Sequence, residues 1–300
     1  MASVLRSTAW WTQTRQYLEL IRFSHTLFAL PFALTSALLA WQAEPVRLWD
    51  VVGILWCMLT ARSTAMAFNR IADRHYDAAN PRTASRHLPT GRLSLTGVTV
   101  FTLLSAGLFV LGTLFFLMRT PANWLPLALA VPVLLFLWSY SYTKRFTWLC
   151  HFWLGASLML APIATWIAIC GAVSWTPILL GLAVWAWVAG FDIIYACQDI
   201  DFDRQAGLYS IPARYGITRA LWMARLCHAT MLAALALLWW QASLGWVFGA
   251  GLLVIAALLV YEHVLVKPHD LSLVNRAFFQ VNALVSIGLF GSVLLDLWVT

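Results

Sequence analysis

Residues 176–203 read TPILLGLAVWAWVAGFDIIYACQDIDFD, and this stretch decides the fold. It begins with a long apolar run in which Asp192 is the only charged residue. Since about 20 apolar residues in a helix cross the core of a bilayer, the run predicts a membrane-spanning helix. Asp199, Asp201 and Asp203 follow directly, so the predicted helix ends in an acidic segment.

The rest of the chain has the same apolar character. Hydrophobic residues make up 62% of the 300 residues and charged residues 10%, whereas soluble domains are about a quarter charged. This composition excludes a water-soluble or disordered protein. It predicts an all-α polytopic membrane protein, a bundle of nine transmembrane helices. The predicted spans are 25–41, 49–68, 94–117, 122–142, 149–171, 176–198, 221–240, 244–266 and 275–298.

The distribution of cations predicts the orientation of the chain. Most of its 19 Lys and Arg residues fall on the side of the N-terminus when the spans are threaded alternately, and only Arg47 and Arg119 fall in loops on the other side. By the positive-inside rule, the N-terminus and the acidic segments face the cytoplasm of a plasma (inner) membrane. We expect residues 1–24 to form a cytoplasmic segment and residues 25–300 a single transmembrane domain. The net charge of +7 then reports topology and not nucleic-acid binding.

Two acidic segments end two predicted spans that run in the same direction. Asn69, Asp73 and Asp77 are spaced by four residues, as are Tyr195, Asp199 and Asp203. On a helix this spacing places side chains on one face. Asp192 lies seven residues before Asp199, and Arg62 stands in the same relation to Asn69. Charged residues inside a span are costly and are therefore candidates for function.

Carboxylate and amide oxygens are suited to a hard cation, and Mg²⁺ prefers one or two carboxylates together with substrate phosphate oxygens. The two segments therefore predict a magnesium-bridged diphosphate site. Arg70, Arg74, Lys144 and Arg145 supply positive charge at the same level, and Arg is favoured for forked phosphate contacts. The alternative for either segment alone is a solvated, salt-bridged helix end.

Four motifs carry a resemblance to a known family. They are Asn69-x-x-x-Asp73-x-x-x-Asp77, Arg86-His-Leu-Pro89-Thr-Gly91-Arg92, Tyr140-x-x-x-Lys144-Arg145 and Tyr195-x-x-x-Asp199-x-x-x-Asp203. Together they resemble the UbiA superfamily of intramembrane aromatic prenyltransferases, and in particular its 4-hydroxybenzoate polyprenyltransferase-like branch. The resemblance implies a nine-helix bundle around a central cavity that is capped by cytoplasmic loops. It is equally close to relatives that prenylate 1,4-dihydroxy-6-naphthoate for menaquinone.

The resemblance also implies an activity, the transfer of a polyprenyl group from polyprenyl diphosphate to a ring carbon of an aromatic hydroxy acid in quinone biosynthesis. The expected metal ligands for two Mg²⁺ are Asn69, Asp73, Asp77, Asp199 and Asp203. Tyr140 and Lys144 are expected at the diphosphate, with Arg70, Arg74, Arg145 and Tyr195 around the substrates. Arg62 or Arg22 is expected to hold the acceptor carboxylate, and Asp192 to meet its hydroxyl or the departing proton. No protein partner is expected.

A secondary transporter is the alternative from another class. Transporters place their ionisable residues near the middle of the bilayer, whereas these acids lie at one face. Prenyl-diphosphate consumption by purified protein would favour the enzyme, and uptake into proteoliposomes the transporter. The seven histidines show no metal spacing, and we expect loop or interfacial roles for them.

Overall fold

The computed structural model describes residues 14–21 and 29–299, and these residues form helices joined by short loops. A short helix covers residues 14–20. The further elements are α2 Leu30–Ala40, α3 Leu48–Ala72, α4 Arg74–Ala79, α5 Leu95–Thr113, η2 Leu114–Met118, α6 Leu125–Thr143, α7 Cys150–Cys170, α8 Trp175–Ala196, η3 Cys197–Asp199, α9 Ile200–Gln205, α10 Ile211–Tyr215, α11 Ile217–Gln241, α12 Trp246–Leu265, α13 Val274–Arg276, the π-helical η4 Ala277–Val281 and α14 Asn282–Val299.

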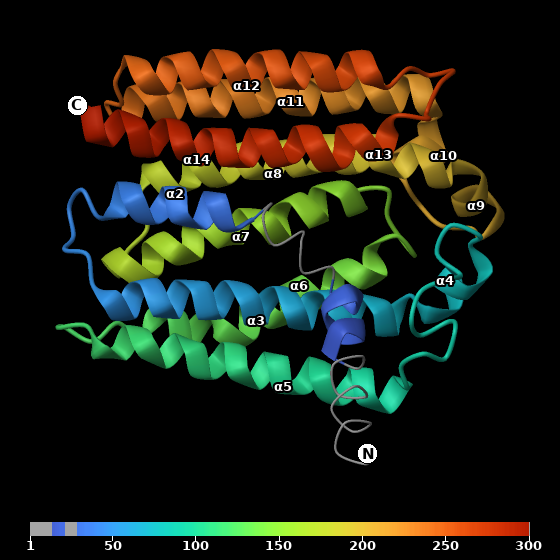
Figure 1. The fold of residues 1–300 in the computed structure, drawn as a ribbon, viewed down its shortest axis with the longest axis horizontal. Coiled ribbons are helices and arrows are strands. Elements are labelled where there is room, and N and C mark those ends of the chain that lie inside the picture. The colour runs from blue at the N-terminus through green and yellow to red at the C-terminus, as the bar shows by residue number, and fades with distance from the viewer. Residues whose placement is uncertain (1–13, 22–28, 300) are drawn as a thin grey trace, which may run out of the picture.

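Eight of the described helical segments are long and apolar enough to cross a membrane, and α2 is a shorter apolar helix of 11 residues. The prediction of a polytopic all-α bundle is confirmed, and nine spans agree approximately with eight long helices plus α2. The long helices lie side by side along one direction (Figure 1). The short helices α4, α9 and α10 gather at one end, and the C-terminal end of α14 lies at the opposite end (Figure 1). The first predicted span, 25–41, lies partly outside the described residues.

α8 is the most enclosed of the long helices. It packs between α7 and α11, and Trp187 at its centre is fully buried against Phe32 of α2. A helix that is apolar all round belongs in the interior of a bundle. The second acidic segment therefore emerges from the middle of the molecule and not from its edge.

Polar side chains fix neighbouring helices inside the apolar bundle. The indole N–H of Trp187 donates to Oδ1 of Asn282 at 2.7 Å, and Nδ2 of Asn282 donates to Oε1 of Glu262 at 3.0 Å. This chain joins α8, α14 and α12. Since apolar burial does not drive helix association in lipid, such hydrogen bonds and close packing hold the helices together.

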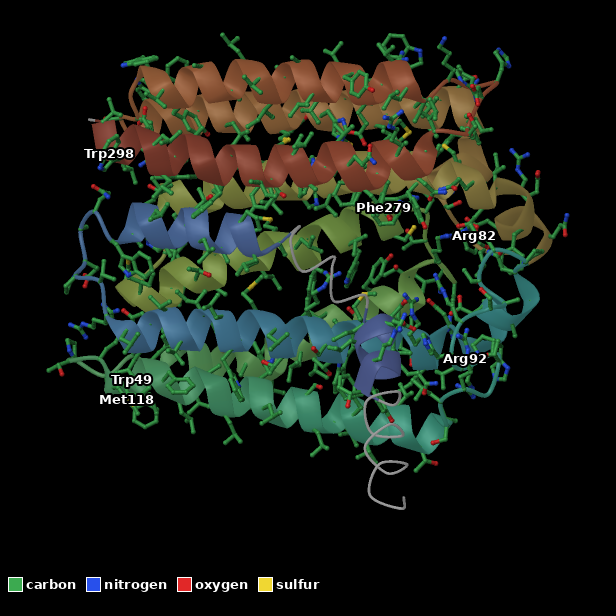
Figure 2. The ribbon with its side chains drawn as sticks, viewed as in Figure 1. Trp49, Arg82, Arg92, Met118, Phe279 and Trp298 are labelled. Atoms are coloured by element: carbon green, nitrogen blue, oxygen red, sulfur yellow. The ribbon has the colours of Figure 1, made fainter. Side chains whose placement is uncertain are left out.

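At the end opposite to α4 and α9, a buried ion cluster ties the loops together. Arg119 binds Asp50 at 2.5 Å and Glu44 at 3.0 Å. The Asp50 side chain is 1% exposed and that of Arg119 7%. Trp49 and Trp298 lie at this end of the bundle, and Arg82 and Arg92 at the other (Figure 2). Aromatic residues near helix ends are typical of membrane interfaces.

Candidate active site

Both acidic segments contain a helix break at their middle aspartate. Asp73 ends α3 with φ −93° and ψ 5° and then begins α4. Asp199 ends η3 and begins α9 with φ −103° and ψ 8°. These dihedrals lie in the bridge region, where many active-site residues are found. The helix expected to run unbroken through each segment is therefore interrupted at an aspartate, because α3 gives way to α4 at Asp73 and η3 gives way to α9 at Asp199.

The first segment is linked to α6. Nδ2 of Asn69 donates to Asp73 at 2.8 Å and lies 3.4 Å from Oγ of Ser141. Arg145, which follows α6, binds the other oxygen of Asp73 at 3.4 Å and the carbonyl of Ala72 at 2.7 Å. The guanidinium of Arg145 also lies over the rings of two tyrosines, Tyr76 and Tyr142. Three of the predicted site residues, Asn69, Asp73 and Arg145, thus converge at the end of α3.

Asp77 binds the loop that follows it. Its Oδ1 accepts from Arg86 at 2.6 Å, and its backbone carbonyl accepts from Thr83 at 3.0 Å. The residue is 6% exposed, and its Oδ2 is buried with no hydrogen-bond partner among the described residues. A buried carboxylate oxygen without a donor is costly. Asp77 therefore presents an oxygen that a cation would satisfy.

Asp199 in the second segment is bound by the same loop. Arg82 donates from Nε to Oδ1 at 2.8 Å and from Nη2 to Oδ2 at 2.5 Å, and Nδ2 of Asn80 donates to Oδ1 at 3.1 Å. Arg82 also donates to the hydroxyl of Tyr195 at 2.8 Å and lies over its ring. The loop after the first acidic segment thus reaches the second segment directly.

Lys144 and Arg145 join the two segments. Lys144 Nζ lies 3.2 Å from Asp203, while Arg145 binds Asp73. Asp203 is 1% exposed. Lys144 and Arg145 directly follow α6, and each contacts a different acidic segment. The two segments therefore lie on either side of this pair of residues.

Charge and burial shift the pKa of Asp73 and that of Lys144. Burial raises the pKa of Asp73 above its usual range, and the charge of Asp77 adds to the rise, while Arg145 and Asn69 lower it. For Lys144, burial lowers the pKa, but Asp203, Asp199 and Asp192 outweigh this effect and the pKa is raised. The carboxylates repel one another when ionised, and cations between them relieve that repulsion.

The described residues contain no group of three His, Cys, Asp or Glu side chains arranged to hold a metal ion. Each of the four carboxylates is instead paired with Arg or Lys. The donor set nevertheless fits a hard divalent cation, because it offers only oxygen ligands. The partnerless Oδ2 of Asp77 is the observation that favours such a cation over a purely salt-bridged helix end.

Asp192 lies in α8 on the approach to the second segment. Its Oδ2 lies 2.6 Å from Nδ1 of His151 in the first turn of α7. Tyr140 lies in α6, one turn before Lys144. The predicted loop or interfacial role is wrong for His151 and for His228, because these residues are 0% and 2% exposed and lie inside the bundle.

The remaining predicted site residues are all arginines. Arg70 is buried and donates to Asn69 at 3.2 Å. Arg74 donates to the carbonyl of Ile71 at 3.1 Å, so it does not join the acidic segments to each other. Arg62 is half-buried in α3, two turns before Asn69. Arg22 lies outside the described residues.

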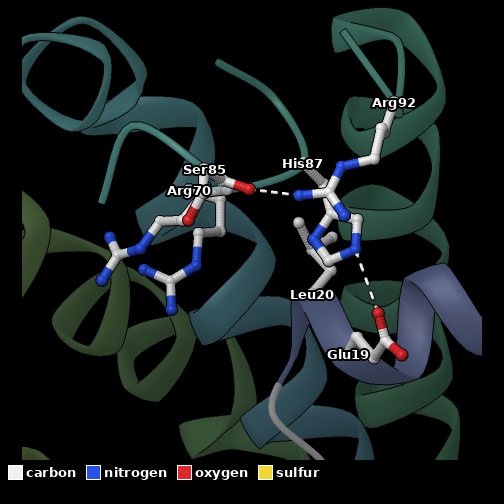
Figure 3. A pocket seen from close by; sticks show the side chains of 7 residues that line it. Glu19, Leu20, Arg70, Ser85, His87 and Arg92 are labelled. Atoms are coloured by element: carbon white, nitrogen blue, oxygen red, sulfur yellow. Dashed lines mark hydrogen bonds and ion pairs between the residues drawn. The ribbon is translucent and has the colours of Figure 1, made fainter. Parts of the chain in front are cut away.

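A cationic pocket of about 270 Å³ lies beside the first segment (Figure 3). It is lined by Glu19, Leu20, Ser85 and the four cationic or titratable side chains of Arg70, Arg86, His87 and Arg92. In Figure 3, Arg92 is hydrogen-bonded to the carbonyl of Ser85 and His87 is paired with Glu19. Arg70 and Arg86 connect this pocket to Asn69 and Asp77, so positive charge surrounds the first segment.

Sequence reasoning missed Arg82, Asn80 and His151. Asn80 and Arg82 flank Pro81 in a turn, and nothing in their spacing reveals a partner 117 residues away. His151 carried a usable signal. α7 begins at the end of the bundle where α8 terminates, so His151 and Asp192 had to lie at similar depth.

Comparison with known proteins agrees with this architecture. The UbiA prenyltransferase family matches residues 29–284. A 4-hydroxybenzoate octaprenyltransferase from Tolumonas auensis is 33% identical over 183 residues, which cover 61% of this chain and 62% of that protein. The chain spans between about half and two thirds of the length of the first curated relatives it matches.

Solved structures share the fold. The apo structure of a UbiA homologue from Aeropyrum pernix K1 is 31% identical, with a TM-score of 0.81 over 91% of this chain and 98% of that one. A UbiA homologue from Archaeoglobus fulgidus, bound to GPP and Mg²⁺, is 21% identical, with a TM-score of 0.67 over 93% of this chain and 99% of that one. The match along most of the sequence, on a bundle that brings two acidic helix ends together, shows that the chain belongs to the UbiA prenyltransferase family.

Proposed function

We propose that this multi-pass membrane protein transfers a polyprenyl group from polyprenyl diphosphate to a ring carbon of an aromatic hydroxy acid. The proposal rests chiefly on one observation, that the consecutive residues Lys144 and Arg145 pair with Asp203 and Asp73 from different acidic segments. A site with carboxylates and cations from three helix ends suits a diphosphate with divalent metal ions. The ligands of the Archaeoglobus fulgidus homologue support this assignment.

The metal ligands in this proposal are Asp73, Asp77, Asp199 and Asp203, with Asn69 as a neutral oxygen donor. Bound Mg²⁺, which we take to number two, would act as a Lewis acid and neutralise the charge of the leaving diphosphate. Arg82, Arg86, Lys144 and Arg145 pair with these carboxylates, and they place four further positive charges where the diphosphate would lie. Fixed charges of this kind stabilise a developing anion without reorganisation.

The acceptor belongs on the Asp192 side of the site. Transfer forms a bond between the prenyl carbon and the ring, and the ring then loses a proton. We assign Asp192 to the acceptor hydroxyl, because its carboxylate lies in α8 between the second acidic segment and the interior of the bundle. The rings of Phe191, Phe278 and Tyr195 pack together at this level, with centroids 5.2 Å and 4.3 Å from that of Phe278. Their apolar surface would exclude water from the reactive prenyl group.

We infer 4-hydroxybenzoate as the acceptor, in ubiquinone biosynthesis, because relatives from several bacteria carry that activity in their names. Arg62 is the candidate for its carboxylate. 1,4-Dihydroxy-6-naphthoate, a menaquinone precursor, stays as the second acceptor. The cation distribution supports a cytoplasmic N-terminus and a site at the inner face of the plasma membrane.

The test is product identification. Purified protein in detergent receives Mg²⁺, a polyprenyl diphosphate and one of the two acceptors, and the products are identified by mass. We expect a prenylated hydroxybenzoate that is lost with EDTA and restored by Mg²⁺. Turnover of the naphthoate alone would reassign the acceptor, and no prenyl transfer to either acceptor would contradict the proposal.

A further inference from the structure

His151 makes two hydrogen bonds that determine its protonation. The backbone N–H of Ile211 donates to Nε2 at 3.3 Å, and Nδ1 lies 2.6 Å from Oδ2 of Asp192. A ring nitrogen that accepts a hydrogen bond carries no proton. Nε2 is therefore the acceptor, and the neutral imidazole keeps its proton on Nδ1 and donates it to Asp192.

This contact leaves Asp192 with one committed oxygen and one available oxygen. The side chain of Asp192 is 18% exposed, whereas that of His151 is 0% exposed. Oδ1 has no hydrogen-bond partner among the residues that the structure describes, although it is not sealed from solvent. The carboxylate is thus held in one orientation with a free acceptor oxygen.

The packing of α7 on α8 supports this geometry. Gly155 lies one turn after His151, and a Cβ at this position would be 2.4 Å from the carbonyl oxygen of Trp185. Trp185 lies two turns before Asp192 in α8. Because the backbones approach so closely at Gly155, the short imidazole side chain can span the gap to Asp192.

The residue that binds His151 also links the acceptor side to the diphosphate side. Ile211 begins α10, and the preceding loop is anchored by two backbone bonds. Leu208 N–H donates to the carbonyl of Asp203 at 2.8 Å, and Tyr209 N–H donates to the carbonyl of Lys144 at 2.7 Å. The segment from Leu208 to Ile211 therefore contacts Asp203 and Lys144 on the diphosphate side and His151 on the acceptor side.

We propose that His151 is a positioning residue for the acceptor. It acts through Asp192, whose Oδ1 it directs toward the acceptor hydroxyl. The inference rests on the proposed function. As the C–C bond forms, the diphosphate leaves with the electron pair of the C–O bond, and the hydroxyl proton moves to Oδ1. The ring then passes its own proton to the departing diphosphate, and Asp192 returns the hydroxyl proton. One ring proton is replaced by one prenyl group.

The first experiment compares His151→Asn, His151→Gln and His151→Leu. Asn places an amide N–H near the position of Nδ1, so it can still donate to Asp192, whereas Gln places its amide near Nε2 and Leu donates nothing. Loss of the partner that orients a metal-ligating side chain typically costs about 10- to 100-fold in activity, and we apply the same range to the partner that orients Asp192. We expect that loss in kcat for Leu and Gln, little change in either KM, and recovery to within about 5-fold for Asn.

His228→Leu is the matched control. His228 is 2% exposed and lies in α11, 3.0 Å from His263, and it packs on α8 at Gly190, where it makes no hydrogen bond to Asp192. It reports the general cost of removing a buried histidine. Equal kcat losses in all His151 variants and in His228→Leu, or a normal kcat in His151→Leu, would overturn the proposal.

The second experiment tests whether His151 acts through Asp192. In an Asp192→Asn background, His151→Leu should reduce kcat no further. Additive losses in the double variant would give His151 an independent role and overturn the proposal.

A spectroscopic measurement separates this inference from the proposed function. With ¹⁵N-labelled histidine, one ring should show a protonated Nδ1 and a bare Nε2. This signal should vanish in His151→Leu and shift in Asp192→Asn. It does not depend on turnover, so a protein inactive toward both acceptors would still test the pair. The opposite tautomer, or an imidazolium, would overturn it.

Discussion

Arg82 and Asp199 form a two-pronged ion pair between segments 117 residues apart, with N–O distances of 2.8 Å and 2.5 Å. The loop that carries Arg82 follows the first acidic segment, and Asp199 belongs to the second. The Arg82–Asp199 pair therefore links the loop after the first acidic segment to the second segment. Lys144 and Arg145 make a second link, because they bind Asp203 and Asp73.

The shape of the Arg82 side chain should matter as well as its charge. Arg82→Lys keeps the charge but cannot make two parallel bonds and also reach Tyr195. We expect kcat/KM for the prenyl diphosphate to fall about 10-fold, and Arg82→Ala to be worse, as for loss of a charge-assisted hydrogen bond worth about 1.5–3 kcal/mol. Steady-state kinetics measure this. Arg219→Lys, at an exposed position in α11, is the control and should be silent.

Metal binding should be visible without catalysis. The unfolding temperature in detergent should rise when Mg²⁺ and a non-hydrolysable prenyl diphosphate analogue are added, since a ligand at 100 times its Kd stabilises by about 2.7 kcal/mol. Asp73→Asn and Asp199→Asn should abolish most of this rise. Asp201→Asn should retain it, because Asp201 is exposed. A full rise in the first two variants would refute the assigned ligands.

Gly155→Ala should disturb the contact between α7 and α8. The added Cβ would meet the backbone carbonyl oxygen of Trp185 at 2.4 Å, and backbone cannot rotate away. We expect a destabilisation of about 1–3 kcal/mol, typical of overpacking, and a lower kcat because His151 moves away from Asp192. Gly107→Ala in α5 is the matched control, since a Cβ there meets nothing within 4 Å. Thermal unfolding and kcat should separate the two variants.

The ion cluster at the opposite end should affect stability alone. Arg119→Met leaves the buried carboxylate of Asp50 without its partner, which costs about 3–5 kcal/mol. Glu44→Gln should cost much less, because the Glu44 side chain is 37% exposed. Unfolding in a denaturant series tests the ranking. The kcat of the folded fraction should be unchanged in both variants, and a selective loss of kcat would show that this end influences the reaction.

The spans were predictable from the sequence because each apolar run is bounded by charged or turn-forming residues. Residues 176–198, for example, match the extent of α8 and η3 closely. The acidic segments were equally visible, since their spacing of four repeats in two places. Both features are local, and local patterns are what hydrophobicity and helical periodicity encode.

The breaks at Asp73 and Asp199 were not predictable from that spacing, because a period of four is also satisfied by an unbroken helix. Nor was the partner of Asp199. Arg82 reaches it through the path of a loop after Pro81, and a loop path depends on tertiary contacts that no periodicity records. The role of His151 depended on the depth of α7 beside α8, which required the topology and not only the residue.

The hydrogen-bonded chain from Trp187 through Asn282 to Glu262 has a consequence for how the protein is assembled. If α14 shifted by one turn, about 5.4 Å, the side-chain amide of Asn282 would lose its hydrogen bonds to Trp187 and Glu262. The buried carboxyl group of Glu262 would then have lost this donor. Helices with only apolar side chains would tolerate a shift of one turn. The hairpin of α12 and α14 therefore contains hydrogen-bonding groups that define its own register, and it can dock beside α8 in one register only.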